Sequence, residues 1–431
     1  MAVDPSATCS HGLAAIPSAV ETATTTSEAY QEIWWQKTVP LLAKMLSSTN
    51  MNPSHQEVYT SFFAQTLLPM LGPYPQQFRS VITRSGLPVE FSVNYQQHGG
   101  IDPVWRIGFE PVGKDSGSPE DPYNQAAISD LLRALARLQL AEYDTSLLDH
   151  FVTAHTVSVA DRKLLQGQQM ECNDTSRSQV AFGFDLKNGT IAVKGYTFPA
   201  MKCKATGKDF GTIVRESIAP LTDTFGSLPA FDLVDDYMMK TDGYSDVAFF
   251  SWDCVAPIRS RFKLYSATND VVWSKVEEIW TLGGRVSDPT TLKGLYYLQR
   301  LWKLLRITEG YRAFNGGFDD GTDSTPTPIV WNYEMRPGAL IPVTKFYFPI
   351  HGQNDITVVR GLAEFLQEIG LAEHGLGFEQ TVREYYPELD LNKTACLTSW
   401  ISFAYTEQTG VYLSVYYHSS LDYPWALDKD Q

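Results

Sequence analysis

Residues 178–199 read SQVAFGFDLKNGTIAVKGYTFP, two strand-like segments on either side of the dipeptide Asn188-Gly189. Asn-Gly between two such segments is a strong signal for a β-hairpin with a two-residue turn. Successive side chains of a strand point to opposite faces, so Lys194 and Tyr196 share one face. The stretch therefore predicts a hairpin that turns a lysine and a tyrosine the same way.

Four further pairs of strand-like segments follow the same design. Helical segments, with apolar residues three and four apart, fill the gaps between the pairs. The order is two helices and then two strands, and antiparallel hairpins joined in this way close most naturally into a barrel with helices outside. The sequence therefore predicts an α/β fold, an antiparallel ten-stranded β-barrel surrounded by helices and built from five ααββ repeats (the ABBA barrel). The paired segments are 88–97 and 102–111, 178–186 and 190–199, 246–255 and 260–268, 327–335 and 343–351, and 399–405 and 410–420.

The pair Lys-x-Tyr recurs in three of these hairpins, each time among apolar and aromatic residues. The alternate neighbours are mostly apolar and would face the helices, which turns the polar residues toward the barrel interior. Other strands carry arginine, tyrosine and one carboxylate in the same phase. The residues predicted to line the lumen are Glu90, Arg106, Lys194, Tyr196, Arg261, Lys263, Tyr265, Lys345, Tyr347, Tyr412 and Tyr416.

A solvated lysine on an exposed strand is the ordinary interpretation of any single Lys-x-Tyr copy. Three copies in separate hairpins, with Arg106 and Arg261 in phase, favour a functional lumen instead. Lysine and arginine are costly to bury without an anionic partner, and together with tyrosine hydroxyls they fit a diphosphate. The faces of tyrosine rings also stabilise a carbocation and screen it from water. The pattern thus points to allylic prenyl transfer.

The composition of the chain bounds its class and its partners. Of the 431 residues, 43% are hydrophobic, which is ample for a large core. The net charge of -15 argues against nucleic acid and against an anionic membrane surface as partners. Five widely spaced cysteines without CxxC are typical of reduced thiols, and no run of 18 apolar residues occurs. We expect a cytoplasmic monomer or homodimer.

One barrel domain is expected over residues 28–420. Residues 1–27 are small, polar and Thr-rich, without the basic start and apolar run of a signal peptide, so they are predicted to be a disordered tail. Residues 421–431 are predicted to be a C-terminal tail.

The string DDGTD, with Asp319, Asp320 and Asp323, offers a competing interpretation. It fits the Asp-Asp-x-x-Asp pattern that binds magnesium in isoprenyl diphosphate synthases, where the acids must lie along one helix face. Here FNGG precedes the string and STPTP follows it, so no helix can run through. We therefore expect neither a metal site nor a cofactor.

Several longer motifs carry a family resemblance: GPYP, GLPVEFSVNYQ, WRIGFEP, FDLKNGTIAVKGYTFP, SRFKLYSA, EIWTLGG, KFYFP and VYLSVYYH. Through them the chain resembles, from about Tyr30 to Ser420, the fungal aromatic (indole) prenyltransferases of the dimethylallyltryptophan synthase type. Within this family the chain is similar in particular to the enzymes that act on cyclic dipeptides and catalyse the reverse prenylation of brevianamide F. The motifs that carry this closer similarity are RSGLPVEFS, AFGFD, VKGYTFP, WTLGGR, TPIVWNYE and VYLSVYYHS.

The resemblance implies dimethylallyl diphosphate as donor, no metal, and a tryptophan-containing cyclic dipeptide as acceptor. Brevianamide F, which is cyclo-L-Trp-L-Pro, or a near analogue is the implied acceptor. The resemblance also implies that the dimethylallyl group is attached to indole C2 through its tertiary allylic carbon. Other acceptors such as cyclo-Trp-Ala, attachment at C3 and normal C2 attachment stay open. A barrel that binds an aromatic or phosphorylated ligand without chemistry is the alternative from another class.

Carried over position by position, Glu90 matches the glutamate that accepts the indole N–H. Val81, Ile82 and Trp400 fall where relatives line the acceptor pocket. Ala181 stands where tryptophan-prenylating relatives have a lysine proposed as proton acceptor, which leaves Glu90 as the leading base. The residues that match the family's diphosphate-binding cage are Arg106, Lys194, Tyr196, Arg261, Lys263, Tyr265, Tyr347 and Tyr416. Lys345 is also assigned to the cage, at a position that is glutamine in some relatives, and Tyr412 is added from its strand phase.

Overall fold

The computed structural model describes residues 26–49, 51–98, 102–166, 177–244, 248–312 and 327–419. The first helix begins at Thr26, just ahead of the predicted domain start at residue 28. Most of the two predicted tails lies outside the described residues, so the domain boundaries stay predictions.

Ten antiparallel strands close into one barrel, with the order β1-β12-β11-β10-β9-β6-β5-β4-β3-β2. The barrel closes where β1 pairs with β12, so that the first and last strands of the sheet lie side by side. The predicted ten-stranded antiparallel barrel is therefore confirmed. Its strands are β1 (Val89–Gln96), β2 (Val104–Phe109), β3 (Val180–Lys187), β4 (Thr190–Thr197), β5 (Phe249–Asp253), β6 (Phe262–Thr268), β9 (Ile329–Met335), β10 (Val343–Phe348), β11 (Thr398–Thr406) and β12 (Gly410–Tyr417).

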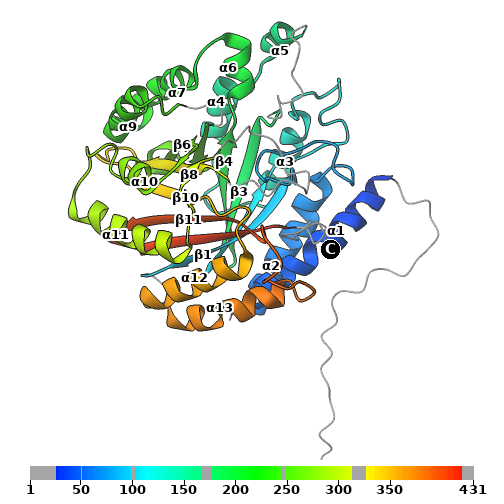
Figure 1. The fold of residues 1–431 in the computed structure, drawn as a ribbon. Coiled ribbons are helices and arrows are strands. Elements are labelled where there is room, and N and C mark those ends of the chain that lie inside the picture. Colours follow the sequence, from blue (N-terminus) through cyan, green and yellow to red (C-terminus); the bar gives the residue numbers. More distant parts are fainter. Residues whose placement is uncertain are drawn as a thin grey trace, which may run out of the picture.

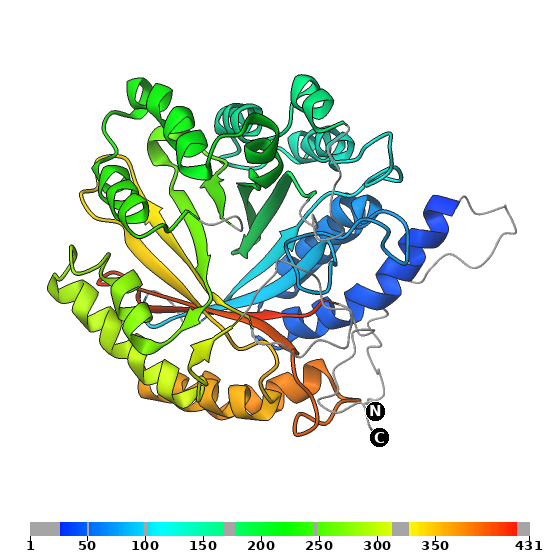
Figure 2. The same cartoon turned by 45° about the horizontal axis from the view of Figure 1, so that its top comes forward.

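Helices form a layer outside the strands, as Figures 1 and 2 show from two directions. A small two-stranded sheet, β7 (Asp270–Val271) with β8 (Gly310–Tyr311), lies apart from the barrel. The α-helices are α1 (Thr26–Ser47), α2 (Pro53–Phe62), α3 (Ala126–Arg137), α4 (Ser146–His155), α5 (Val159–Leu165), α6 (Ala200–Thr206), α7 (Phe210–Ile218), α8 (Thr222–Phe225), α9 (Pro229–Lys240), α10 (Trp273–Trp280), α11 (Pro289–Leu304), α12 (Asp355–Glu368) and α13 (Ala372–Tyr385). Shorter turns are a π-helix (Phe63–Leu67) and 3₁₀ turns at Leu68–Met70, Ala219–Leu221 and Pro257–Arg259.

The prediction of two helices per repeat is too simple for the second and third repeats. Among the described residues, three α-helices lie between β2 and β3, and four lie between β4 and β5. Helices α5 and α6 have seven residues each, which is too short for a 3.6-residue period to be visible in the sequence. A capping box between Ser158 and Asp161 starts α5, so local hydrogen bonds define this helix more clearly than its pattern of apolar residues does.

The predicted turn at Asn188-Gly189 forms as expected. Asn188 and Gly189 have φ angles of 52° and 75°, the left-handed conformation that a two-residue hairpin turn requires. The flanking residues Lys187 and Thr190 pair directly. This turn fixes the register of β3 against β4 and therefore decides which residues of both strands point inward.

The main hydrophobic core lies between the barrel and its helices. Phe91 and Phe346, two outward residues of the strands, are 1% and 0% exposed. Phe91 packs edge-on against Phe63 at a ring-centroid distance of 5.7 Å, and Phe346 packs against Trp302 at 6.1 Å. The apolar strand faces are thus turned to the helices, and the polar faces are left for the lumen.

The barrel has two unlike ends. At one, which we call the turn end, short connections join the strands of each hairpin; at the other, which we call the helix end, the chain runs to and from the helices. Within the part of the chain that the structure describes, no helix combines the length and the apolar character needed to cross a membrane.

Candidate active site

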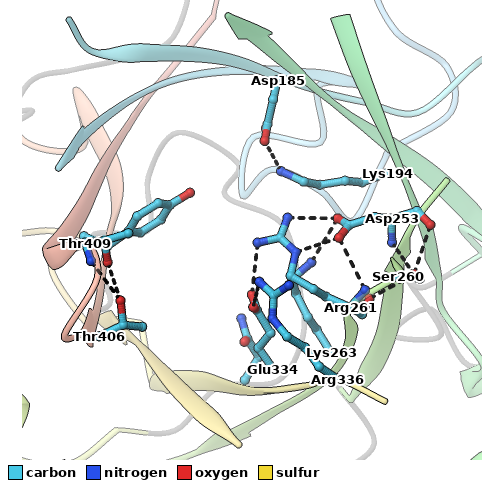
Figure 3. A network of polar contacts seen from close by, with 12 residues as sticks. Asp185, Lys194, Asp253, Ser260, Arg261, Lys263, Glu334, Arg336, Thr406 and Thr409 are labelled. Atoms are coloured by element: carbon cyan, nitrogen blue, oxygen red, sulfur yellow. Dashed lines mark hydrogen bonds and ion pairs between the residues drawn. The ribbon is translucent and has the colours of Figure 1, made fainter. Parts of the chain in front are cut away.

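The cationic residues predicted for the lumen lie at the following places in the barrel. Arg106, Lys263 and Lys345 lie near the starts of β2, β6 and β10, at the turn end. Lys194 lies in the middle of β4, and Arg261 comes immediately before β6. Figure 3 shows Lys194, from β4, converging on the same space as Arg261 and Lys263, from the β6 side of the barrel.

The prediction that Glu90 is the one carboxylate of the lumen is wrong. Asp185, Asp253 and Glu334 also point into it, close to the cations (Figure 3). The physical reason is that a buried cation needs a counterion even before a substrate arrives. The same two-residue period would have found them, since Asp185 follows Gly183 by two positions on the inward face.

Asp185 joins two of the cations. Its carboxylate accepts from Arg106 Nε at 2.8 Å and from Lys194 Nζ at 2.5 Å. Burial alone would raise the pKa of Asp185, but the Arg106 and Lys194 charges outweigh it and hold that pKa well below its usual range. Burial also lowers the pKa of Lys194, to about 8, although Asp185 opposes this shift. Asp185 is therefore ionised throughout the neutral range.

Asp253 and Glu334 hold the second group of cations. Asp253 accepts from Arg261 Nε at 2.6 Å and lies 3.5 Å from Lys263 Nζ. Glu334 accepts from Arg261 at 3.3 Å and from Arg336 at 3.2 Å. Burial would raise the pKa of Asp253, but Lys263 and Arg261 hold it well below its usual range. The two carboxylates thus hold Arg261 between them.

Lys345 differs from the other four cations. Its amine lies 4.3 Å from the ring centroid of Tyr412, and no carboxylate of the described chain lies within ion-pair distance of it. The same Tyr412 ring faces Arg106 at 5.2 Å, and its hydroxyl accepts a hydrogen bond from Arg106. Arg106 also donates to Ser414 at 3.0 Å.

A belt of aromatic rings lies next to the charged residues, toward the helix end. The successive ring-centroid distances Tyr196–Tyr265, Tyr265–Tyr347 and Tyr347–Tyr416 are 6.3, 6.2 and 6.2 Å. Burial is the main reason why the pKa values of all four hydroxyls lie above the ordinary tyrosine value. The hydroxyls therefore stay protonated and can donate hydrogen bonds. The predicted tyrosines are thus brought together into one continuous wall.

Two more rings complete the aromatic belt. Trp400, predicted as an acceptor residue, stands edge-on to Tyr347 at 6.3 Å. Phe249, which the sequence interpretation missed, stacks on Tyr265 at 4.0 Å. Phe249 faces Tyr265 directly across the β5–β6 ladder, a register that only the folded hairpin defines.

Glu90 stands at the helix end, in the second position of β1. Its side chain is buried and accepts a hydrogen bond from the Ser399 hydroxyl at 2.7 Å. Burial raises the pKa of Glu90 to about 8, although the Ser399 hydrogen bond lowers it in part. No cation neutralises Glu90 among the described residues, so it is poised to accept a proton or an N–H donor.

Between Glu90 and Lys194, the barrel wall has a glycine on each of the two intervening strands, so neither strand adds a side chain there. Glu90 is paired with Gly108, Gly108 with Gly183, and Gly183 with Lys194. A Cβ atom at Gly183 would lie 3.1 Å from the Tyr196 ring, so a side chain there would push that ring out of place. Glycine at this position therefore lets the Tyr196 ring lie close against β3.

Val81 and Ile82, predicted to line the acceptor pocket, lie in the segment before β1, at the helix end. The Val81 N–H donates to the Ser178 hydroxyl, and the Ile82 N–H donates to the Ser80 hydroxyl. Both serine hydroxyls donate in turn to the carboxylate of Glu110. The structure fixes the backbone of Val81 and Ile82 but shows no contact of their side chains with the lumen residues, so their role stays a prediction.

Glu110 is fully buried and receives a third hydrogen bond, from Asn124 at 2.9 Å. Burial raises the pKa of Glu110 to about 7, against the three hydrogen bonds that lower it. The Glu110 backbone N–H also donates to the Pro88 carbonyl, two residues before Glu90. Glu110 therefore ties the start of β1 to the segment that carries Val81, which the sequence interpretation did not foresee.

The competing DDGTD string lies outside the described residues. Within the described part of the chain, no group of three or more histidine, cysteine, aspartate or glutamate side chains could hold a metal ion.

The lumen thus combines three chemical functions in order along the barrel. Five cations between the turn end and the middle of the barrel can hold an anionic leaving group. Aromatic faces next to them can stabilise a carbocation. A buried carboxylate at the helix end can hold an N–H group of a flat acceptor.

Known proteins share this architecture and much of the sequence. A family model described as tryptophan dimethylallyltransferase matches residues 30–381. The chain is 55% identical over 418 residues to the prenyltransferase phqI of Penicillium fellutanum, with 92% of this chain and 90% of the relative covered. It is 43% identical over 406 residues to the deoxybrevianamide E synthase notF of an Aspergillus species, with 92% and 89% covered.

The solved structures agree with the sequence relatives. The crystal structure of NotF in complex with brevianamide F and DMSPP matches with a TM-score of 0.82 and 40% identity, covering 94% of this chain and 98% of that chain. AnaPT from Neosartorya fischeri matches with a TM-score of 0.79 and 28% identity, covering 91% and 94%. With a family match over most of its length and relatives of this identity along the barrel, the chain belongs to the tryptophan dimethylallyltransferase family and is an aromatic prenyltransferase.

Proposed function

We propose that the enzyme transfers the dimethylallyl group of dimethylallyl diphosphate to indole C2 of cyclo-L-Trp-L-Pro, through the tertiary allylic carbon. The proposal rests on one observation above all: a buried carboxylate, Glu90, and a diphosphate-sized group of cations share one lumen, with tyrosine rings between them. The likeness to NotF, which was solved with brevianamide F and DMSPP, supports this choice of acceptor. Membership of a prenyltransferase family speaks against the alternative of a purely ligand-binding barrel.

In the first step the C–O bond of the donor breaks, and its electron pair leaves with the diphosphate. Arg106, Lys194, Arg261, Lys263 and Lys345 stabilise the negative charge that develops there, which is an electrostatic contribution to catalysis. The tyrosine faces stabilise the allylic cation, and the closed barrel keeps out the water that would quench it.

In the second step the indole π electrons form the new C–C bond. Glu90 accepts the indole N–H, which raises the electron density of the ring at the moment of attack. The ring then loses a proton to become aromatic again, and Glu90 is the carboxylate that we propose takes it.

The acceptor and the regiochemistry are tested by product analysis. Incubating the enzyme with dimethylallyl diphosphate and a panel of tryptophan-containing cyclic dipeptides should give the fastest turnover with cyclo-L-Trp-L-Pro. The NMR spectrum of that product should show a 1,1-dimethylallyl group on C2. A C3 product, a 3,3-dimethylallyl group, or a preference for cyclo-Trp-Ala would replace the proposed reaction by one of its alternatives.

We expect activity to persist in excess EDTA, because the five cations supply the charge that a metal would otherwise supply. Initial rates with and without EDTA, after dialysis against the chelator, measure this. Loss of activity that magnesium restores would instead support a metal role for the DDGTD string.

The acceptor step should depend on pH through Glu90. Because burial raises the pKa of Glu90 to about 8, the carboxyl is mostly protonated at neutral pH and becomes an acceptor as the pH rises. At saturating donor, kcat/KM for the acceptor should therefore increase about tenfold per pH unit below that value and level off above it. In Glu90→Gln the residual rate should lose this dependence; an unchanged profile in the variant would assign the titration to another group.

A further inference from the structure

One cation of the lumen is bound differently from the others. Arg106 and Lys194 share Asp185, and Arg261 and Lys263 share Asp253. Lys345 is left without a carboxylate partner among the described residues, although its side chain points into the same buried space.

The charges that face Lys345 are mostly of its own sign. Arg106 on β2, Lys194 on β4 and Lys263 on β6 all oppose a positive charge on it. The one carboxylate that favours such a charge, Glu334 on β9, is already bonded to Arg261 at 3.3 Å and to Arg336 at 3.2 Å.

The strands beside Lys345 offer no other charge. In the sheet, Lys345 faces Asn332 on one side and Ala404 on the other. The neutral Tyr412 of β12 provides only a ring face, which it also presents to Arg106. Burial, followed by the Arg106 charge, holds the pKa of Lys345 well below the ordinary lysine value.

We propose that Lys345 is uncharged in the empty barrel and takes up a proton from solvent when a diphosphate enters the cage. This inference rests on the proposed function, because it assumes that the cations bind a diphosphate. The anion reverses the sign of the field at the Lys345 amine, so that protonation becomes favourable. The enzyme therefore avoids an unpaired charge among like charges while empty, and gains a fifth cation only when a leaving group is there to stabilise.

The same link between proton and anion also applies when the product diphosphate is released. After transfer, the inorganic diphosphate must leave, and Lys345 loses its proton as the anion departs. Substrate binding and product release are thus linked to proton uptake and proton loss at one residue, by the reciprocity that all binding linkage obeys. The other four cations keep their carboxylate partners throughout, so their charges are balanced with or without the anion.

The test is isothermal titration calorimetry of inorganic diphosphate at neutral pH, in two buffers of different ionisation enthalpy. Comparing the two heats gives the number of protons taken up on binding. The matched variant is Lys345→Arg, whose guanidinium keeps its charge at every accessible pH. Protons exchanged by the ligand cancel in the difference, and making both measurements in a Lys194→Arg background removes the proton exchange at Lys194.

We expect the wild-type enzyme to take up about one proton more than Lys345→Arg for each diphosphate bound. Lys345→Gln should bind diphosphate about tenfold more weakly, without the extra uptake, because it loses one charge-assisted hydrogen bond. Equal proton uptake by wild type and Lys345→Arg would overturn the inference while leaving the proposed function standing. If none of the three proteins binds diphosphate, the cage itself is wrong, and the proposed function fails with it.

Discussion

Replacing Glu90 with glutamine is expected to lower turnover of the indole acceptor by at least about 100-fold, the range for losing a positioned general base. Glutamine keeps the shape and can still accept from Ser399, so the buried pocket stays filled. It cannot take a proton, and its amide donates where the indole N–H needs an acceptor. Steady-state kinetics at saturating dimethylallyl diphosphate measure the loss.

The control for Glu90→Gln is binding of inorganic diphosphate. Glu90 lies at the helix end and, within the described part of the chain, forms no ion pair with the five cations. The diphosphate affinity should therefore stay within about twofold of wild type, as for distant independent sites. Turnover close to that of wild type would show that Glu90 does not take part. A joint loss of turnover and diphosphate binding would show a general disturbance of the lumen instead.

Asp253→Asn should destabilise the empty enzyme and make it bind diphosphate more tightly. Removing the charge leaves Lys263, whose side chain is 6% exposed, and Arg261, which is 27% exposed, without their common counterion. Breaking a buried pair in this way costs about 3 kcal/mol, the lower end of the usual range because Arg261 keeps some contact with solvent. Bound diphosphate restores the balance, so its stabilising effect on thermal unfolding should be larger in the variant.

The matched control for Asp253→Asn is Glu142→Gln. Glu142 accepts from Arg259 at 2.8 Å, close to the β5–β6 hairpin, but both side chains are more than half exposed. Exposed pairs contribute at most about 1 kcal/mol, so this variant should unfold and bind diphosphate like the wild type. If Asp253→Asn were as stable as Glu142→Gln, and if its diphosphate affinity were unchanged, Asp253 would not be a counterion of the cage.

The barrel and the inward direction of the cage residues could be predicted because both depend on a two-residue period. Lys194 and Tyr196 must share a face in any strand, and the Asn188-Gly189 turn fixes their register with β3. The same rule places Asp185 and Glu334 on the inward face. The sequence interpretation omitted these acids because it assigned the anion that faces the cations to the substrate.

The sequence could not provide the distances between side chains on strands that meet only when the barrel closes. The Ser399 hydroxyl that holds Glu90 comes from a residue 309 positions later in the chain. The isolation of Lys345 follows from how three carboxylates are divided among five cations, which no pattern within one strand reports. The short helices α5 and α6 were missed because seven residues are too few to show a helical period.

The most direct test of this account is a crystal structure of the enzyme with dimethylallyl thiolodiphosphate and cyclo-L-Trp-L-Pro bound together. The account predicts the diphosphate oxygens among Arg106, Lys194, Arg261, Lys263 and Lys345, and the allylic carbons against the tyrosine belt. It predicts the indole N–H within hydrogen-bond distance of the Glu90 carboxylate. A diphosphate bound outside these cations, or an indole N–H directed away from Glu90, would contradict it.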